Sequence, residues 1–382
     1  MEPPRHGRPG SGALRVPDRV RRCAVDTLLA AAAVVLGCAA PPRANPHAEL
    51  RSTFEHAAMG TLFRLTLYAP DETQSELAAR AAFERIDAIE RVATDYDARS
   101  EARALGRDAY GRWVRLSPDL ARVVRAADRA VEISGGAFDP TVGPLVRLWR
   151  RALRDEEWPD AERWSAARAR TGWERIVELD EREDGLHVRL AVPDVRLDFG
   201  GVAKGLAVDE ALAELQRRGV RSALLDGGGD VAALDPPPGE AGWKVAVRPF
   251  AEAGASTMPF LLSGAAVATS GDAYRRGRLS GAPLPGIEEE DAEYGHVLDP
   301  RTALPLVAPR AAVMTAGSAA EADASATARL VLGTAATGVP ELERGVFFGP
   351  PDADACVGAL FPHDGVSPAK DPERESTYDL SD

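Results

Sequence analysis

The sequence predicts an α+β protein in which short, mostly antiparallel strands pair as hairpins and helices pack over them. Two observations predict this fold. Strand-like runs are only four to eight residues long and some are joined by tight glycine turns, as at 226–230. Several longer segments carry apolar residues at helical spacing. With 45% hydrophobic residues in 382, the chain can build a sizeable core, and we expect one folded unit over 53–365.

The first half of this unit begins with a strand and two helices. Residues 61–68 alternate apolar and polar side chains, which indicates a half-buried strand. Residues 75–92 place apolar side chains at helical spacing, so we expect a helix that ends near Asp95. A second helix is expected over 118–134, because Ser117 can cap it and Pro118 suits its first position.

The second half mixes short strands, loops and one clear helix. Residues 150–180 are rich in charges and carry Trp158, Trp164 and Trp173; we expect short helices on the surface there. Further expected elements, in chain order, are strands at 222–225, 231–234, 243–247 and 265–268, an acidic loop at 281–293 and a helix from 319 to about 332. Ser318 and Glu321 form the capping box of that helix.

The two ends of the chain differ from this folded unit. Residues 1–38 combine a basic start, a short apolar run and a lipobox-like end at Cys38, which favours a signal peptide and a lipid anchor at that cysteine. The alternatives are an ordinary secretory signal or a disordered leader. We expect residues 39–52 to form a flexible tether and 366–382 a disordered tail. We therefore expect an exported protein that is anchored to a bacterial membrane and faces the periplasm or the cell exterior.

Composition excludes some functions. The net charge of −13 argues against nucleic acid as a partner. The three cysteines have neither metal-ligand spacing nor a disulfide pattern.

The stretch 196–219, RLDFGGVAKGLAVDEALAELQRRG, predicts a strand, a glycine turn and a helix that stops at Gly219. Lys204, one of only three lysines, lies at the mouth of this helix. Backbone N–H groups and the positive helix end would both face an anion there, which favours a phosphate site. The alternative is a tight turn with a solvated lysine.

On the helix from 319, Asp323 and Thr327 are four residues apart and so share one face. A carboxylate and a hydroxyl in this arrangement suit a hard cation such as Mg²⁺. The alternative is a pair of surface polar residues on an alanine-rich helix.

Seven sequence blocks together carry a family resemblance. LDFGGVAKGLAVDEALAEL resembles the D-x-x-x-x-A-K-G-x-A-x-D signature of the ApbE family of FAD:protein FMN transferases. The other blocks follow in the family's order: MGTLF, FDPTVGPLVRLW, LDGGGD, TSGD, HVLDPRT and EADASAT. The resemblance implies two interlocked halves with a flavin cleft between them.

The resemblance also implies a reaction. FMN is transferred from FAD to a Thr or Ser hydroxyl of an exported or membrane-attached acceptor protein, typically a membrane electron-transfer complex subunit, and AMP is released. Mg²⁺ is the implied cofactor. Two alternatives remain open: a pyrophosphatase that converts FAD to FMN and AMP, and a non-catalytic FAD-binding lipoprotein.

Site residues follow from the same match, position by position. The implied metal ligands are Gly201, through its carbonyl, Asp323 and Thr327. The implied FAD contacts are Met59, Tyr96, Ala137, Phe138, Asp139, Asp198, Lys204 and His296. For Met59, Tyr96 and Phe138 the alternative is ordinary core packing.

Catalysis would use Lys204 for charge, and His296 is the candidate base for the attacking hydroxyl. A structural role for His296 is equally compatible with the sequence, and Asp299 could serve as the base or orient the site instead. Two residues depart from the family pattern. Asp226 stands where Asn is usual and could repel phosphate, and Ala303 stands where Gly is frequent, so the turn there is expected to differ.

Overall fold

A computed structural model describes residues 49–250, 257–271, 276–281, 283–284, 292–307, 309–336, 338–349 and 363–369. The chain divides into two compact units, Met1–Pro46 and His47–Asp382, and the described residues belong to the second. The expected signal peptide, the anchor at Cys38, most of the acidic loop at 281–293 and the tail beyond 369 lie outside the described residues. Within these ranges, no helix is both long and apolar enough to cross a bilayer.

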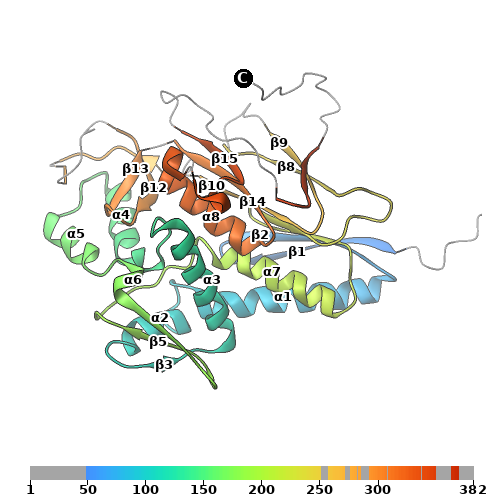
Figure 1. The fold of residues 1–382 in the computed structure, drawn as a ribbon, viewed down its shortest axis with the longest axis horizontal. Coiled ribbons are helices and arrows are strands. Elements are labelled where there is room, and N and C mark those ends of the chain that lie inside the picture. The colour runs from blue at the N-terminus through green and yellow to red at the C-terminus, as the bar shows by residue number, and fades with distance from the viewer. Residues whose placement is uncertain are drawn as a thin grey trace, which may run out of the picture. The chain divides into compact units, whose positions relative to one another are not determined.

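In the described residues, a seven-stranded antiparallel sheet with the order β1-β2-β6-β7-β10-β14-β15 is the framework of the fold (Figure 1). Its strands are β1 (Leu50–Ala58), β2 (Thr61–Ala69), β6 (Ala223–Gly227), β7 (Asp230–Ala233), β10 (Ala266–Gly271), β14 (Ala311–Ala316) and β15 (Gly345–Phe348). Strands β1–β2 and β6–β7 are hairpins, whereas β7–β10 and β10–β14 join segments far apart in the chain. The predicted α+β class, with short and mostly antiparallel strands, is confirmed.

Alternation along the central strands gives this sheet two apolar faces. Ala266 and Ala268 of β10 pack into the main core, while Val267 between them packs on the opposite face. Met314 and Val313 of β14 divide in the same way. Because side chains alternate across a strand, both faces require cover.

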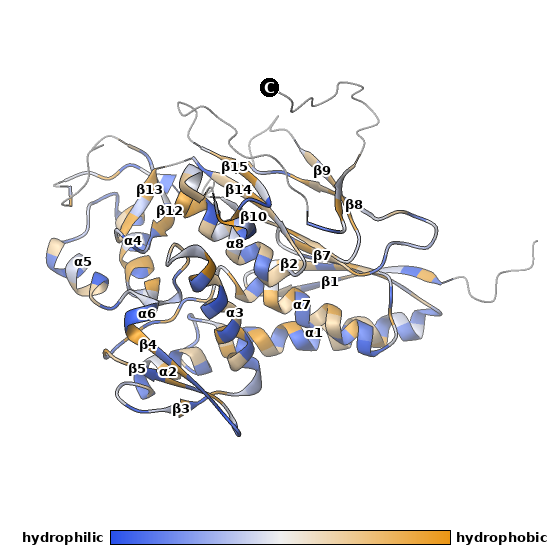
Figure 2. Cartoon of the chain, in the orientation of Figure 1, coloured by the Kyte–Doolittle hydropathy of each residue, from blue (hydrophilic) through white to orange (hydrophobic). Residues whose placement is uncertain are grey.

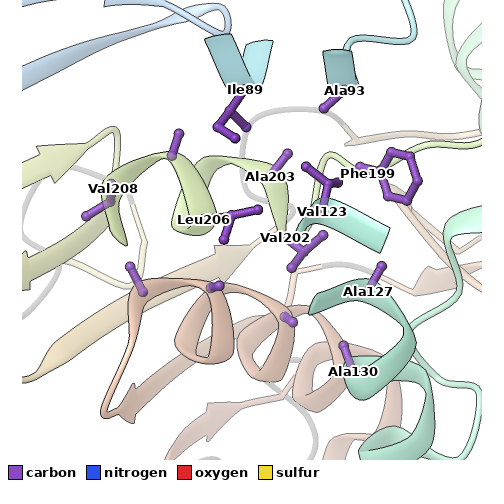
Figure 3. Close-up of a cluster of buried hydrophobic side chains, with 14 of the residues drawn as sticks. Ile89, Ala93, Val123, Ala127, Ala130, Phe199, Val202, Ala203, Leu206 and Val208 are labelled. Atoms are coloured by element: carbon purple, nitrogen blue, oxygen red, sulfur yellow. The ribbon is translucent and has the colours of Figure 1, made fainter. Parts of the chain in front are cut away.

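Eight α-helices lie in the described residues, and three of them cover one face of the large sheet. Their bounds are α1 (Glu72–Ala93), α2 (Glu101–Asp108), α3 (Pro118–Ser134), α4 (Gly143–Asp155), α5 (Ala161–Arg168), α6 (Trp173–Ile176), α7 (Ala203–Arg217) and α8 (Ala319–Leu332). Helices α1, α7 and α8 pack on the sheet and on one another, and α3 packs against α1 and α8. Figure 2 shows the apolar positions of these helices, and Figure 3 shows the shared cluster that includes Ile89, Val123, Val202 and Leu206.

Three small sheets complete the described part. The sheet β8 (Trp243–Val247), β9 (Met258–Leu262) and β16 (Val366–Pro368) contributes Trp243, Phe260 and Leu262 to the apolar cluster on the opposite face of the large sheet. The other two sheets are β3 (Val114–Arg115), β4 (Val177–Arg182) and β5 (Gly185–Leu190), and β11 (Arg276–Gly277), β12 (Tyr294–Asp299) and β13 (Leu304–Val307). Residues Pro140–Val142, Gly333–Ala336 and Pro340–Leu342 are 3₁₀ turns.

Several boundaries correct the sequence analysis. The tether expected over 39–52 runs into β1, which starts at Leu50, and the tail expected from 366 starts with β16, which pairs with β9. Residues 196–199 form no strand, although Leu197 and Phe199 are buried as their apolar character requires. The helices expected from Ser117 and Ser318 begin as predicted, with both serine side chains accepting an N–H bond.

The tryptophans of 150–180 also correct an expectation. The expected short helices form there as α5 and α6, and many of the residues of this segment are exposed, but Trp164 and Trp173 are buried in the interior. Trp164 Nε1–H and the buried Trp149 Nε1–H both donate to the carbonyl of Ala303, over 3.0 and 3.1 Å. Ala303 adopts φ +63, so the turn keeps a left-handed conformation without glycine, against our expectation that it would differ. The two indole bonds hold this strained residue in place.

We predict that the two indole donors are redundant in part. Either Trp149→Phe or Trp164→Phe leaves the Ala303 carbonyl with one donor, whereas the double variant leaves a buried acceptor unsatisfied. The double variant should therefore lose about 1 kcal/mol more unfolding free energy than the two single losses added together. Urea unfolding of the four proteins measures this coupling, and strict additivity would contradict it.

Candidate active site

A cleft of ≈ 850 Å³ runs along the ends of α1, α7, α8, β10 and β12. Nearly all residues singled out by the sequence line it: Met59, Tyr96, Ala137, Phe138, Asp139, Asp198, Gly201, Lys204, His296, Asp323 and Thr327. They come from segments up to 268 residues apart in the chain (59 to 327). The fold therefore brings together side chains that only the family resemblance had connected.

One end of the cleft gathers oxygen donors around Gly201. A Cβ placed on Gly201 would lie 2.9 Å from Thr327 Oγ1 and 3.0 Å from Phe138 Cε2, so a side chain there would crowd both neighbours. Thr327 Oγ1 also lies 3.1 Å from Ser270 Oγ. Asp323, one turn earlier on α8, is 3% exposed and accepts the N–H of Gly205 over 3.2 Å. Carboxylate, hydroxyl and carbonyl oxygens are the ligands that Mg²⁺ takes in proteins.

Lys204 lies between two buried carboxylates. Its ammonium group forms an ion pair with Asp230, and its Nζ is 3.8 Å from Oδ2 of Asp323. Asp230 is 1% exposed and ends the DGGGD turn, which the sequence analysis had treated as a simple strand reversal. With both acids ionised, the two carboxylates and one ammonium carry a local charge of −1. A bound cation would offset it.

The pKa values in this group follow from burial and charge. Burial by itself would lower the pKa of Lys204, but Asp323 and Asp230 outweigh it and raise that pKa above its ordinary value. Burial, with the mutual repulsion of the carboxylates, raises the pKa of Asp230, and burial raises the pKa of Asp323 against the attraction of Lys204. The lysine therefore stays charged, whereas burial disfavours the charged forms of the two acids, and a second positive group beside them would favour those forms.

The start of α7 differs from the expected anion site. The N–H of Ala203 donates to the carbonyl of Phe199, and the N–H of Gly205 donates to Asp323. These two amide groups are therefore used within the protein and do not face an anion. The positive end of the helix acts on the Asp323 carboxylate instead.

Another part of the cleft lining is apolar and aromatic. Met59 has φ +50 and Gly60 φ +73, so the β1–β2 turn is of the type that normally takes Asn-Gly, and the N–H of Met59 donates to Glu90 Oε1 over 2.8 Å. Phe138 is buried, whereas Tyr96 is 76% exposed and its hydroxyl accepts a bond from Arg150 over 2.7 Å. The surface formed by Met59, Tyr96 and Phe138 suits a flat aromatic ligand.

The acidic residues near this end have different uses. Asp139 accepts the N–H groups of Thr141 and Trp173, so its carboxylate holds the backbone while burial raises its pKa. Asp198 accepts the N–H of Gly200, and burial raises its pKa, with a further rise from Asp95. Both line the cleft, as does buried Ala137.

Two predicted residues behave differently from the rest. Asp299 is not among the residues that line the cleft, and its carboxylate forms a bidentate pair with Arg301 within the DPRT turn. This geometry favours a turn-forming role over a base. Asp226 likewise accepts the N–H of Gly229 inside its own turn, so its carboxylate is used locally. His296, in contrast, lies half-buried on β12 and lines the cleft.

Sequence reasoning missed four residues of the site. Asp230 pairs with Lys204, Glu90 binds the Met59 amide, and Arg150 contacts Tyr96. Arg196 pairs with the cleft residue Asp95 over 2.9 Å. Of these, only Asp230 lies in a motif that the sequence analysis named, the DGGGD turn, but that motif does not show which cation its carboxylate pairs with.

The fold and cleft define a class of proteins with an oxygen-rich, charged end and an aromatic end in one site. The chain belongs to the ApbE family, whose model matches residues 59–342. It is similar to the FAD:protein FMN transferase of Klebsiella pneumoniae (strain 342), at 31% identity over 255 residues, or 66% of this chain and 73% of the relative. The FAD:protein FMN transferase of Escherichia coli (strain K12) is 27% identical over 312 residues, or 80% and 86% of the two chains.

A solved structure shows the same architecture. The apo form of the Pseudomonas stutzeri flavinyl transferase ApbE matches with a TM-score of 0.66 at 26% identity, over 78% of this chain and 90% of that one. The mixed helix and antiparallel-sheet fold expected from the sequence is therefore confirmed by a solved relative.

We predict that the metal-free protein gains stability as the pH falls from 7 toward 5. Burial raises the pKa of Asp209 on α7 to about 6, against bonds from the Ala319 and Ala320 amides, while an unfolded aspartate titrates near 4. Between these values the folded chain holds more protons than the unfolded chain, so the unfolding free energy decreases as pH rises, by on the order of 2 kcal/mol for this group. Urea unfolding in EDTA measures this slope. Asp209→Asn should reduce this slope without abolishing it, because other buried acids such as Asp230 also have a raised pKa. An unchanged slope would contradict the assignment.

Proposed function

We propose that this protein transfers FMN from FAD to a Thr or Ser hydroxyl of an acceptor protein, releases AMP, and depends on Mg²⁺. One observation carries the proposal: a single cleft is lined both by the polar residues Lys204, Asp323 and Thr327 and by Met59, Tyr96 and Phe138. Its volume of ≈ 850 Å³ is in the range of sites that bind large ligands. The curated relatives named above carry the same activity in their names.

The oxygen-rich end fits a magnesium ion. Asp323, Thr327 and the carbonyl of Gly201 would hold it, and water would complete the shell, as is usual for Mg²⁺. In the described residues, no group of three or more His, Cys, Asp or Glu side chains is placed to hold a metal, so the proposed site relies on one carboxylate, one hydroxyl and one carbonyl. A divalent ion bound there would neutralise charge on the diphosphate oxygens.

The residues of the chain then have separate roles. Met59 and Phe138 provide an apolar surface for the isoalloxazine ring, and Tyr96 closes it from the open side. Lys204, fixed by Asp230, keeps a positive charge beside Asp323 and supports the breaking diphosphate bond through electrostatics. Positioning and charge supply most of the catalysis in phosphoryl transfer.

His296 is the proposed base. The hydroxyl oxygen of the acceptor forms a bond to the phosphorus on the FMN side, and the bond from that phosphorus to the AMP oxygen breaks. The hydroxyl proton passes to the His296 imidazole, and AMP leaves with its phosphate. The N-terminal segment supports export and attachment to a membrane through Cys38, where a membrane electron-transfer subunit is the expected acceptor.

The decisive test offers two substrates in parallel. The protein is incubated with FAD, Mg²⁺ and an exported candidate acceptor that carries a Thr site, or with the same acceptor carrying Ala there. We expect intact-mass spectrometry to find FMN added to the Thr acceptor only, with equimolar AMP and none in EDTA. Free FMN with AMP but no labelled acceptor would establish hydrolysis instead, and FAD binding without AMP would establish a non-catalytic protein.

We predict that His296→Gln lowers the rate of transfer by about 10²- to 10⁴-fold, because the attacking hydroxyl loses its base. FAD affinity should fall much less than the rate, since the other implied FAD contacts remain. His56→Gln is the matched control, because His56 pairs with Asp87 on the β1–α1 surface and does not line the cleft. Single-turnover AMP release and FAD fluorescence titration measure the two quantities. A His296→Gln protein with the wild-type rate would refute the base.

A further inference from the structure

Asp209 is the last residue of the D-x-x-x-x-A-K-G-x-A-x-D signature, and none of the roles above uses it. It lies on α7, five residues after Lys204. Its two carboxylate oxygens accept the N–H groups of Ala319 and Ala320 over 2.7 and 2.9 Å. These are the first two residues of α8, so a side chain of one helix caps the N-terminus of the other.

A second attachment joins the same two helices one turn away. The N–H of Gly205 donates to Asp323 on α8. A Cβ on Gly205 would lie 2.3 Å from the carbonyl oxygen of Ala319, so the helices approach as closely as glycine allows. Gly205 and Asp209, about one turn apart on α7, thus both lie against the start of α8. The two helices are fixed to each other by hydrogen bonds at two points.

The rest of this contact is apolar and has little directionality. Ala319, Ala322 and Ala326 of α8 are fully buried in the cluster that contains Val202 and Leu206 (Figure 3). Contacts between small apolar side chains stabilise the packing but resist sliding of one helix along the other only weakly. The hydrogen bonds that Asp209 accepts are directional. They therefore determine the position of α8 along the axis of α7.

The position of α8 matters because it carries two of the proposed metal ligands. Asp323 lies about one turn beyond the capped amides, and Thr327 lies one turn further. The third, Gly201, precedes α7, and it is close enough to Thr327 that a Cβ would crowd the hydroxyl. A shift between α7 and α8 therefore changes the distance between ligands on opposite sides of the site.

Neighbouring acids have other partners. Glu210, next in the chain, pairs with Arg85 and Arg122, and Glu321 lies 3.5 Å from Arg344. Asp209 thus differs from both in directing its carboxylate at backbone amides.

We propose that Asp209 is a positioning residue for the metal site: by clamping the start of α8 to α7, it sets Asp323 and Thr327 against Gly201. This inference rests on the proposed function, because Asp323, Thr327 and Gly201 are assigned as metal ligands only in that proposal. Asp209 itself touches neither metal nor substrate. Its removal should therefore weaken metal binding and leave the flavin end of the cleft unaffected.

The test measures metal binding directly, without turnover. Isothermal titration of FAD-free Asp209→Ala with Mg²⁺, and Mn²⁺ titration followed by electron paramagnetic resonance, should show affinity about 10- to 100-fold below wild type. FAD affinity in EDTA should equal that of the wild type. Asp209→Asn keeps one acceptor oxygen and should lie between the two. Asp160→Ala is the matched control, since it removes a carboxylate cap of the same kind from α5, and it should bind Mg²⁺ normally.

A second variant acts on the same contact from the other side. Gly205→Ala leaves Asp209 intact but forces α8 away from α7, so it should also weaken Mg²⁺ binding. If circular dichroism shows that Asp209→Ala is unfolded, Gly205→Ala and Asp209→Asn serve as the test variants instead. Wild-type Mg²⁺ affinity in Asp209→Ala, or an equal loss in Asp160→Ala, would overturn the positioning role alone. A wild-type protein that binds no Mg²⁺ would overturn the metal site itself, and this inference with it.

Discussion

The ion pair between Lys204 and Asp230, with Asp323 beside it, is the interaction on which the rest of this site depends. Burying three charged groups is costly unless each is compensated, and removing one member of a buried pair leaves the others uncompensated. The surroundings supply that compensation. Asp230 ends a hairpin turn, Asp323 lies on a helix whose start is capped, and Lys204 lies in the first turn of a third element. The fold must therefore hold three separate elements in register before the charges balance.

The packing around this group explains how the register is kept. Helices α1, α3, α7 and α8 share one apolar cluster, and their alanine-rich contacts allow close approach. The large sheet supports them from one side, while Trp243 and its neighbours cover the opposite face of that sheet. The site is thus placed on rigid elements, whereas its aromatic end is placed on turns. Met59 and Tyr96 lie on such segments, and a ring-binding surface tolerates small displacements better than metal coordination does.

Local chemistry made much of this architecture predictable. The capped helices from Ser117 and Ser318 and the hairpin around Asp226–Asp230 follow from short-range rules, and the structure has them at the expected places. Strand β1 was missed because its outward side chains are polar and because its pairing with β2 is a tertiary contact that the local sequence does not indicate. The buried tryptophans of 150–180 were misread because the surrounding charge masked them. Asp230 was missed because no local pattern shows which cation a turn carboxylate will meet.

The charge of the chain gives a final reason for a metal in the proposed reaction. An acidic protein of net charge −13 must bind a ligand whose diphosphate carries two negative charges. Lys204 does not provide a net attraction, because Asp230 and Asp323 together outweigh it by one charge. Without a divalent cation, the diphosphate would therefore meet a site of its own sign; with one, the local charge changes from −1 to +1. Metal and FAD should consequently bind with positive coupling, since each reduces the electrostatic cost of the other. In the proposed reaction, a bound cation would keep these buried carboxylates ionised and would give the site the positive charge that an anionic ligand needs.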